Sequence, residues 1–214
     1  MKTILYIDGF NFYYSAVKDT PFKWINLLKL TQSVFPKNTF TAIRYFTARV
    51  HPMPNNPDQP IRQQLYWRAL KTLPNLDIIE GDFRTRKTRM PVVSPPPNTI
   101  EVFKVEEKGS DVNLATHLLV DGFLKRYEAA IVISGDSDLI TPIRMVKEQL
   151  NMPVGVLNPQ RLSGPKPKQR RKNAGLKQAA TFYKNGVRWA QLQSAQFSTT
   201  LTDAHGTFHK PTSW

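Results

Sequence analysis

The chain has 214 residues, no cysteine and a formal net charge of +14, which arises from 30 Lys and Arg against 16 Asp and Glu. This length allows one α/β domain with a buried core, and the lack of cysteine excludes a disulfide framework and a thiolate metal site. The excess of positive charge favours a polyanionic partner such as nucleic acid.

The N-terminal segment predicts where the protein resides. Its apolar run, residues 4–7, is too short for a signal peptide and ends at Asp8. No segment reaches the length that a membrane span needs. We therefore expect a cytoplasmic protein without a membrane partner.

The first half of the chain alternates apolar runs with helical patterns. Residues 4–7 predict a strand, and aromatic residues after Asp8 predict the start of a helix. Helical periodicity predicts helices over 24–34 and 61–73. Further strands are expected over 39–47 and 76–80.

The middle of the chain contains an irregular, basic excursion. Residues 83–93 and 100–105 predict a β-hairpin whose tip is a run of three prolines at 95–97. A helix is expected to follow, with Ser110 as its N-cap and its end near Gly122.

A buried strand is the strongest pattern in the sequence. Residues 131–133 are β-branched and apolar, as in a parallel sheet covered by helices on both faces. A polar turn with Asp136 and Asp138 follows it, and then a helix over 142–150 with Thr141 as its N-cap. Residues 154–157 predict the last strand.

The C-terminal part has a different composition. Residues 158–175 predict a basic loop, residues 176–189 a helix, and residues 192–214 an extended tail with isolated apolar anchors. We expect residues 1–157 to form the catalytic domain and residues 176–214 to pack on it.

Three acidic segments carry the functional argument. Asp8 and Asp136 each follow a predicted strand, and Asp111 starts a predicted helix. If the two strands are neighbours in a parallel sheet, Asp8 and Asp136 leave it at the same edge, where α/β sheets bind ligands. Clustered carboxylates raise one another's pKa unless a cation lies between them, and Mg²⁺ and Mn²⁺ prefer oxygen ligands. The pattern therefore predicts a metal-dependent phosphodiesterase.

The same segments resemble a known family. Residues 8–11 (DGFN), 108–112 (KGSDV) and 134–139 (SGDSDL) are similar to the three signature segments of the NYN family, nucleases with a PIN-like fold. The resemblance covers residues 2 to about 157. It implies a doubly wound parallel sheet in an α/β/α arrangement, a divalent metal ion, and endonucleolytic cleavage of RNA.

The resemblance also implies roles for individual residues. Asp8, Asp111 and Asp136 would bind Mg²⁺ or Mn²⁺, and Asp138 would be a further ligand or an outer acid. Asn11 and Ser134 would support these acids. Many members carry another acid where this chain has His117, so the number of ions stays open.

Two basic runs flank the predicted site. Because phosphate chains bind clustered Lys and Arg, we expect these runs to hold RNA. The candidate RNA-binding residues are Arg84, Arg86, Lys87, Arg89, Lys108, Lys168, Arg170, Arg171 and Lys172.

Structural explanations compete with these assignments. Asp is favoured at strand ends and helix starts, and Asp111 could simply complement a helix dipole. His117 is expected to be a packed, hydrogen-bonded histidine. Asp121 is expected to be solvated at the far end of its helix. The acids at 77, 80 and 82 are expected to face water.

Two other functions compete with an endoribonuclease. One is a catalytically silent RNA-binding module with a vestigial acidic cluster. The other is a small-molecule phosphatase, suggested by the spacing of Asp136 and Asp138. Phosphatases with an aspartyl nucleophile usually carry Asp-x-Asp after the first strand, whereas Gly9 and Phe10 follow Asp8 here. The sequence leaves the oligomeric state open.

Overall fold

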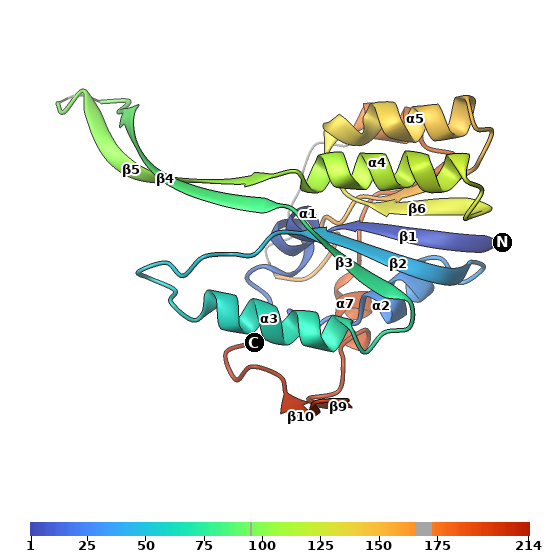
Figure 1. Ribbon diagram of the computed structural model, residues 1–214, viewed down its shortest axis with the longest axis horizontal. Helices are drawn as coiled ribbons and strands as arrows, with labels where there is room; N and C mark the ends of the chain where they lie inside the picture. The colour runs from blue at the N-terminus through green and yellow to red at the C-terminus, as the bar shows by residue number, and fades with distance from the viewer. Residues whose placement is uncertain (95, 166–172) are drawn as a thin grey trace.

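A computed structural model of the chain describes residues 1–94, 96–165 and 173–214. Six parallel strands form the central sheet in the order β3-β2-β1-β6-β7-β8 (Figure 1). From β1 the chain moves outward to β3, and α4 then returns it to the other side of β1. The sheet is therefore doubly wound, as predicted, with its switch point between β1 and β6. The strands are β1 (Lys2–Asp8), β2 (Thr39–Thr47), β3 (Leu76–Glu80), β6 (Ala129–Ile133), β7 (Val154–Leu157) and β8 (Phe182–Lys184).

Helices cover both faces of the sheet, which gives three layers (Figure 1). Alternate residues of a strand point to opposite faces, so Leu5 and Ile7 pack on one layer while Ile4 and Tyr6 pack on the other. The first layer contains α1 (Gly9–Phe12), a π-helical turn (Tyr13–Val17), α2 (Leu27–Val34), α3 (Gln59–Leu70) and α7 (Trp189–Ser194). The second contains α4 (Ser110–Phe123), α5 (Ile140–Glu148) and α6 (Ala174–Ala179).

The predicted hairpin is present and forms a long arm. Strands β4 (Asp82–Pro91) and β5 (Thr99–Lys108) pair antiparallel along their whole length, from Asp82 opposite Lys108 to Pro91 opposite Thr99. The arm leaves the domain between β3 and α4 and extends away from it (Figure 1). Its two ends connect directly to the sheet edge where Asp8 lies.

Two predicted helix starts were wrong. The residue before α4 is Gly109, with φ of +93°, and Ser110 already lies inside the helix. Helix α5 begins at Ile140, after a 3₁₀ turn over Ser137–Leu139 that the Asp136 side chain caps. Short polar residues favour N-caps, but the turn geometry decides which of several neighbours fills that position.

The helix expected over residues 176–189 was also wrong. Helix α6 ends at Ala179, and Phe182–Lys184 forms β8, which pairs with β7. The Phe182 ring packs on Gly155 so closely that a Cβ at Gly155 would lie 2.0 Å from it. Because Gly155 in β7 has no side chain, the Phe182 ring can pack on it, and this contact favours a strand rather than a helix at residues 182–184.

The C-terminal tail folds back on the first layer. Strands β9 (Thr200–Asp203) and β10 (Gly206–His209) form a hairpin. The rings of Phe197, Phe208 and Trp214 surround Trp24 with centroid distances of 6.0–6.4 Å.

None of the helices in the described ranges combines the length and the apolar composition that a membrane span requires.

The expectation that Asp121 is solvated was wrong. Asp121 is fully buried, because it follows Leu114 and Leu118 on the inward stripe of α4. Its carboxylate accepts hydrogen bonds from the Tyr6 hydroxyl (2.8 Å), Arg44 Nε (2.7 Å) and Arg126 (2.9 Å). Burial raises the pKa of Asp121, but these hydrogen bonds outweigh it and hold the pKa below its ordinary value.

Candidate functional site

The first acid of the site, Asp8, lies at the switch point of the sheet. Ile7 is paired with Ile133, so Asp8, the last residue of β1, lies beside Ser134, the first residue after β6. The Ser134 hydroxyl donates to one Asp8 oxygen (2.9 Å), and the Asn11 N–H donates to the other (2.9 Å). Asp8 thereby caps α1 and is only 5% exposed.

The turn after Asp8 requires glycine. A Cβ on Gly9 would lie 2.6 Å from the Tyr45 ring and 2.8 Å from the Phe46 carbonyl oxygen. Because backbone and a packed ring lie on that side, any larger residue would displace the start of α1, and Asp8 with it.

Asn11 and Ser134 tie the two acidic loops together. The Asn11 side-chain oxygen accepts from the Gly135 N–H (3.1 Å), and the Ser134 hydroxyl oxygen accepts from the Asp136 N–H (3.1 Å). Asn11 and Ser134 therefore link Asp8 to the loop that follows β6.

The acids line a cleft of about 330 Å³. Asp8, Asp111 and Asp136 contribute to its wall, whereas Asp138 does not. Asp138 is exposed, and its backbone N–H donates to Asp136 (3.0 Å). The fold thus brings three of the four predicted acids together. The other lining residues are Phe10, Asn11, Tyr14, Ser15 and Glu107.

Glu107 is a member of this cleft that the sequence argument did not single out. It is next to the last residue of β5, and its carboxylate accepts from the Ser110 N–H (3.0 Å) at the start of α4. On the opposite strand it is paired with Phe83, whose ring lies 5.8 Å from that of Phe10. A usable signal existed, since Glu107 is the acid just before the KGSD segment.

The electrostatics of the cleft are those of crowded carboxylates. Burial raises the pKa of Asp8 to about 7, and the charges of Asp111 and Asp136 contribute, against hydrogen bonds from Asn11 and Ser134 that lower it. Burial also raises the pKa of Asp111 to about 6, with further repulsion from Asp136, Glu107 and Asp138. A cation in the cleft would relieve this repulsion.

The donor set fits a hard divalent cation in its chemistry, because it consists of carboxylate oxygens. In the described part of the chain, however, no group of three or more His, Cys, Asp or Glu side chains is arranged so that it could hold a metal ion. His117 is not part of the cleft lining and lies against the Phe46 ring, with 5.6 Å between centroids.

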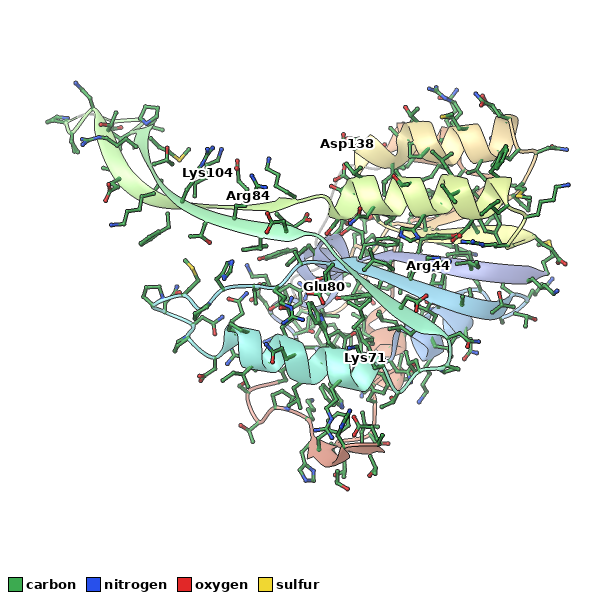
Figure 2. All side chains as sticks on the ribbon, in the orientation of Figure 1. Arg44, Lys71, Glu80, Arg84, Lys104 and Asp138 are labelled. Atoms are coloured by element: carbon green, nitrogen blue, oxygen red, sulfur yellow. The ribbon has the colours of Figure 1, made fainter. Side chains whose placement is uncertain are left out.

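The basic residues of the arm lie on two faces. The pairing of Arg84 with Glu106 and of Arg86 with Lys104 places Arg84, Arg86 and Lys104 on one face, and Lys87 and Arg89 on the other. Figure 2 shows Arg84 and Lys104 along the edge of the arm on the side where Asp138 lies. Lys104 was not predicted. Of the other candidates, Lys108 ends β5, while Lys168, Arg170, Arg171 and Lys172 lie outside the described residues.

A second cavity, of about 290 Å³, adjoins the acidic cleft. Phe10 and Tyr14 line both cavities, and Gly9, the neighbour of Asp8, lines the second. Its walls come from α1, the π-helical turn, β2, α3 and the C-terminal Trp214.

Comparisons with known proteins identify a family, a curated protein of similar sequence and a solved structure of similar fold. The family model described as the NYN domain matches residues 2–183. The chain is 28% identical over 241 aligned positions to 6-hydroxy-3-succinoylpyridine 3-monooxygenase HspA from Pseudomonas putida (strain DSM 28022 / S16), covering 100% of this chain and 75% of that protein. A crystal structure of a protein of unknown function from Vibrio parahaemolyticus RIMD 2210633 is similar with a TM-score of 0.51 and 14% identity, covering 86% of this chain and 91% of that one. That likeness shows the fold alone.

Proposed function

The chain belongs to the NYN domain family, which implies a nuclease-like function related to RNA, and we propose that it is a metal-dependent endoribonuclease. The observation that carries the proposal is the convergence of Asp8, Asp111 and Asp136 in one cleft at the switch point of the sheet. Within the described ranges none of these three acids forms an ion pair, and burial together with repulsion from neighbouring acids raises the pKa of Asp8 and of Asp111.

Asp8, Asp111 and Asp136 would hold Mg²⁺ or Mn²⁺, with Asp138 as an outer acid. When bound, such an ion lowers the pKa of a water molecule and neutralises charge that develops on a phosphodiester. The chain's own part is to fix the carboxylates. Ser134 and Asn11 orient Asp8, and the Ser134 hydroxyl also holds the Asp136 loop through its backbone N–H.

The cleavage assay uses a labelled single-stranded RNA and a structured RNA with Mg²⁺ or Mn²⁺, with and without EDTA. We expect internal cuts that EDTA abolishes, and a loss of at least about 100-fold in rate for Asp136→Asn, because a missing carboxylate weakens charge stabilisation in the transition state. Glu148→Gln is the matched control, since Glu148 is exposed at the far end of α5. Cleavage that persists in EDTA, or that Asp136→Asn retains in full, would reject the proposal.

The same assay separates the enzyme from a silent RNA-binding module. Tight, salt-dependent RNA binding without product under either metal would favour the binding module. Turnover of an aryl phosphate without any action on RNA would favour a phosphatase instead.

The basic face of the arm is expected to hold the RNA. Arg84 and Arg86 form ion pairs with Asp82 (2.8 Å) and Glu106 (3.7 Å), but their side chains are 71% and 64% exposed. Exposed pairs contribute little, so an RNA phosphate can compete with the acids. The double variant Arg84→Gln, Arg86→Gln should weaken binding and lower the slope of log K against log salt by roughly 0.7 per lost phosphate contact.

Fluorescence anisotropy at several salt concentrations measures this slope. Arg144→Gln serves as the control, because Arg144 is exposed on α5. Equal slopes for the double variant and the wild type would remove the arm from the RNA interface.

A second candidate function is hydroxylation of a small aromatic compound. The similarity to a protein named as a 6-hydroxy-3-succinoylpyridine 3-monooxygenase extends over the whole chain, and the second cavity has aromatic walls. Monooxygenation inserts one atom of O₂ and reduces the other to water, so it consumes a two-electron reductant. The test supplies 6-hydroxy-3-succinoylpyridine, O₂ and reduced nicotinamide nucleotide. Hydroxylated product with matching reductant consumption, and no RNA cleavage, would favour this function.

A further inference from the structure

The lining of the second cavity is suited to a planar ligand. Eight of its nineteen lining residues are aromatic, and its volume of about 290 Å³ is near the lower end of the usual range for ligand pockets, roughly 300–1,000 Å³. Such walls bind planar ligands by stacking, as in nucleic-acid-binding proteins that hold unstacked bases. The aromatic lining residues are Phe10, Phe12, Tyr13, Tyr14, Tyr45, Tyr66, Trp67 and Trp214.

The cavity also presents two cationic side chains and a tyrosine hydroxyl. Arg62 and Lys23 line it, and within the described ranges neither forms an ion pair; the Arg62 guanidinium donates only to the Asn56 side chain. Tyr45 also lines the cavity; the residue is 6% exposed, and its hydroxyl, which makes no hydrogen bond to a described residue, is accessible from the cavity. This hydroxyl and the two cations can therefore form hydrogen bonds with a ligand in the cavity.

The position of the cavity beside the acidic cleft indicates the kind of ligand that would fit it. Phe10 and Tyr14 line both this cavity and the acidic cleft, so a ligand that occupies both would contact these rings and extend to the cleft that Asp8 lines. A chain of nucleotides has this shape, because each base carries a neighbouring phosphate. A free aromatic acid would use the ring and the cations but not the connection to the cleft.

We propose that this cavity is a subsite for one unstacked nucleotide of the RNA, with its base among the aromatic rings, its phosphate at Arg62 and Lys23, and the scissile phosphodiester in the adjoining cleft. The proposal rests on the endoribonuclease function for its location of the scissile bond. It adds that the substrate is single-stranded at the cut and that one base is held apart from its neighbours.

Binding of nucleotides can be measured without cleavage. Trp67 and Trp214 line the cavity, so an occupying ring should quench tryptophan fluorescence. The titrations use the full chain in EDTA with four nucleoside 5′-monophosphates, with ribose 5-phosphate as the probe without a base, and with pyridine-3-carboxylate as the aromatic acid without a ribose. We expect saturable quenching by at least one mononucleotide and none by ribose 5-phosphate.

Two variants localise the binding. Arg62→Gln removes a charged donor and should raise Kd about tenfold, and Tyr45→Phe keeps the ring but removes the hydroxyl and should raise Kd about threefold. Arg144→Gln is the control for lost positive charge. Circular dichroism melts identify any variant that fails to fold. If Arg62→Gln does not fold, the test relies on Tyr45→Phe, which loses only one oxygen atom.

Three results would overturn the subsite. These are no saturable quenching by any mononucleotide, unchanged Kd values in both variants, or saturation by pyridine-3-carboxylate while all mononucleotides fail. The last result would assign the cavity to a small aromatic acid. Because these titrations contain no metal ion, metal-dependent cleavage without nucleotide quenching would reject the subsite alone, and quenching without cleavage would reject the endoribonuclease alone.

Discussion

Asp8→Asn is expected to stabilise the metal-free protein at pH 8 and at the same time to abolish RNA cleavage. The pKa of Asp8 rises from its ordinary 3.8 to about 7, chiefly by burial. The folded state therefore holds a proton that the unfolded state releases between these values, and stability falls as pH rises through this window. Above pH 7 the buried carboxylate is charged, and asparagine, of similar shape, is not.

The expected gain at pH 8 in EDTA is on the order of 2 kcal/mol, because each unit of pKa shift corresponds to about 1.4 kcal/mol and asparagine loses part of the hydrogen bonding to Ser134 and Asn11. The gain should shrink by more than half at pH 5, where the folded wild type carries a protonated Asp8. Urea unfolding at the two pH values measures both quantities.

The metal response completes this experiment. Mn²⁺ should raise the Tm of the wild type, since a ligand that binds only the folded state stabilises it, and should not raise the Tm of Asp8→Asn. Asp58→Asn is the control, because Asp58 is exposed in the loop before α3. A variant that is less stable than the wild type at pH 8 in EDTA, or that keeps the Mn²⁺ response, would contradict the assignment of Asp8.

Asp121→Ala is expected to be the most damaging single substitution for stability among the acids discussed. Asp121 is 1% exposed and pairs with Arg44, which is 15% exposed. Removing the carboxylate leaves the Arg44 guanidinium largely buried, with only the exposed Asp77 at 3.2 Å, and breaking a buried pair in this way costs about 3–5 kcal/mol.

Asp77→Ala is the matched control, because Asp77 pairs with the same arginine but its side chain is 66% exposed. Its cost should be about 0–1 kcal/mol. Because the pKa of Asp121 is lowered in the folded state, its contribution is present above the ordinary pKa of 3.8 and is lost as pH falls further. Equal losses of stability for the two variants, measured by urea unfolding at pH 7, would show that the burial of Asp121 does not matter.

RNA cleavage by Asp77→Ala and by any folded Asp121 variant should remain near the wild-type rate. Asp121 lies ten residues after Asp111 on α4, which corresponds to roughly 15 Å along a helix. Stability and activity are therefore separable in this chain, since one set of acids lies in the core and the other in the cleft.

The sequence alone was sufficient for five of the six strands of the central sheet and for the acids that follow two of them, but not for β8. The apolar run at residues 131–133 and the turn after it are local patterns, because burial on both faces requires consecutive apolar residues and the polar turn must end the strand. Since the carboxyl ends of parallel strands share one edge, the approach of Asp8 to the Asp136 loop followed from pairing two such strands. The arm was predictable for a similar reason, from its proline-rich tip and its two strand-like sides.

Only the tertiary structure decided which side chains meet from separate elements. Glu107 reaches the cleft because β5 ends beside α4, and the buried Asp121 is satisfied because Tyr6 and Arg44 approach it from distant strands. Phe182 lies in a strand because Gly155 offers a surface without a side chain. Periodicity and turn chemistry depend on neighbours along the chain, so they could place Glu107 before a signature segment and Asp121 on an inward helix face, whereas the partners of these side chains lie mostly on distant segments and follow only from the packed structure.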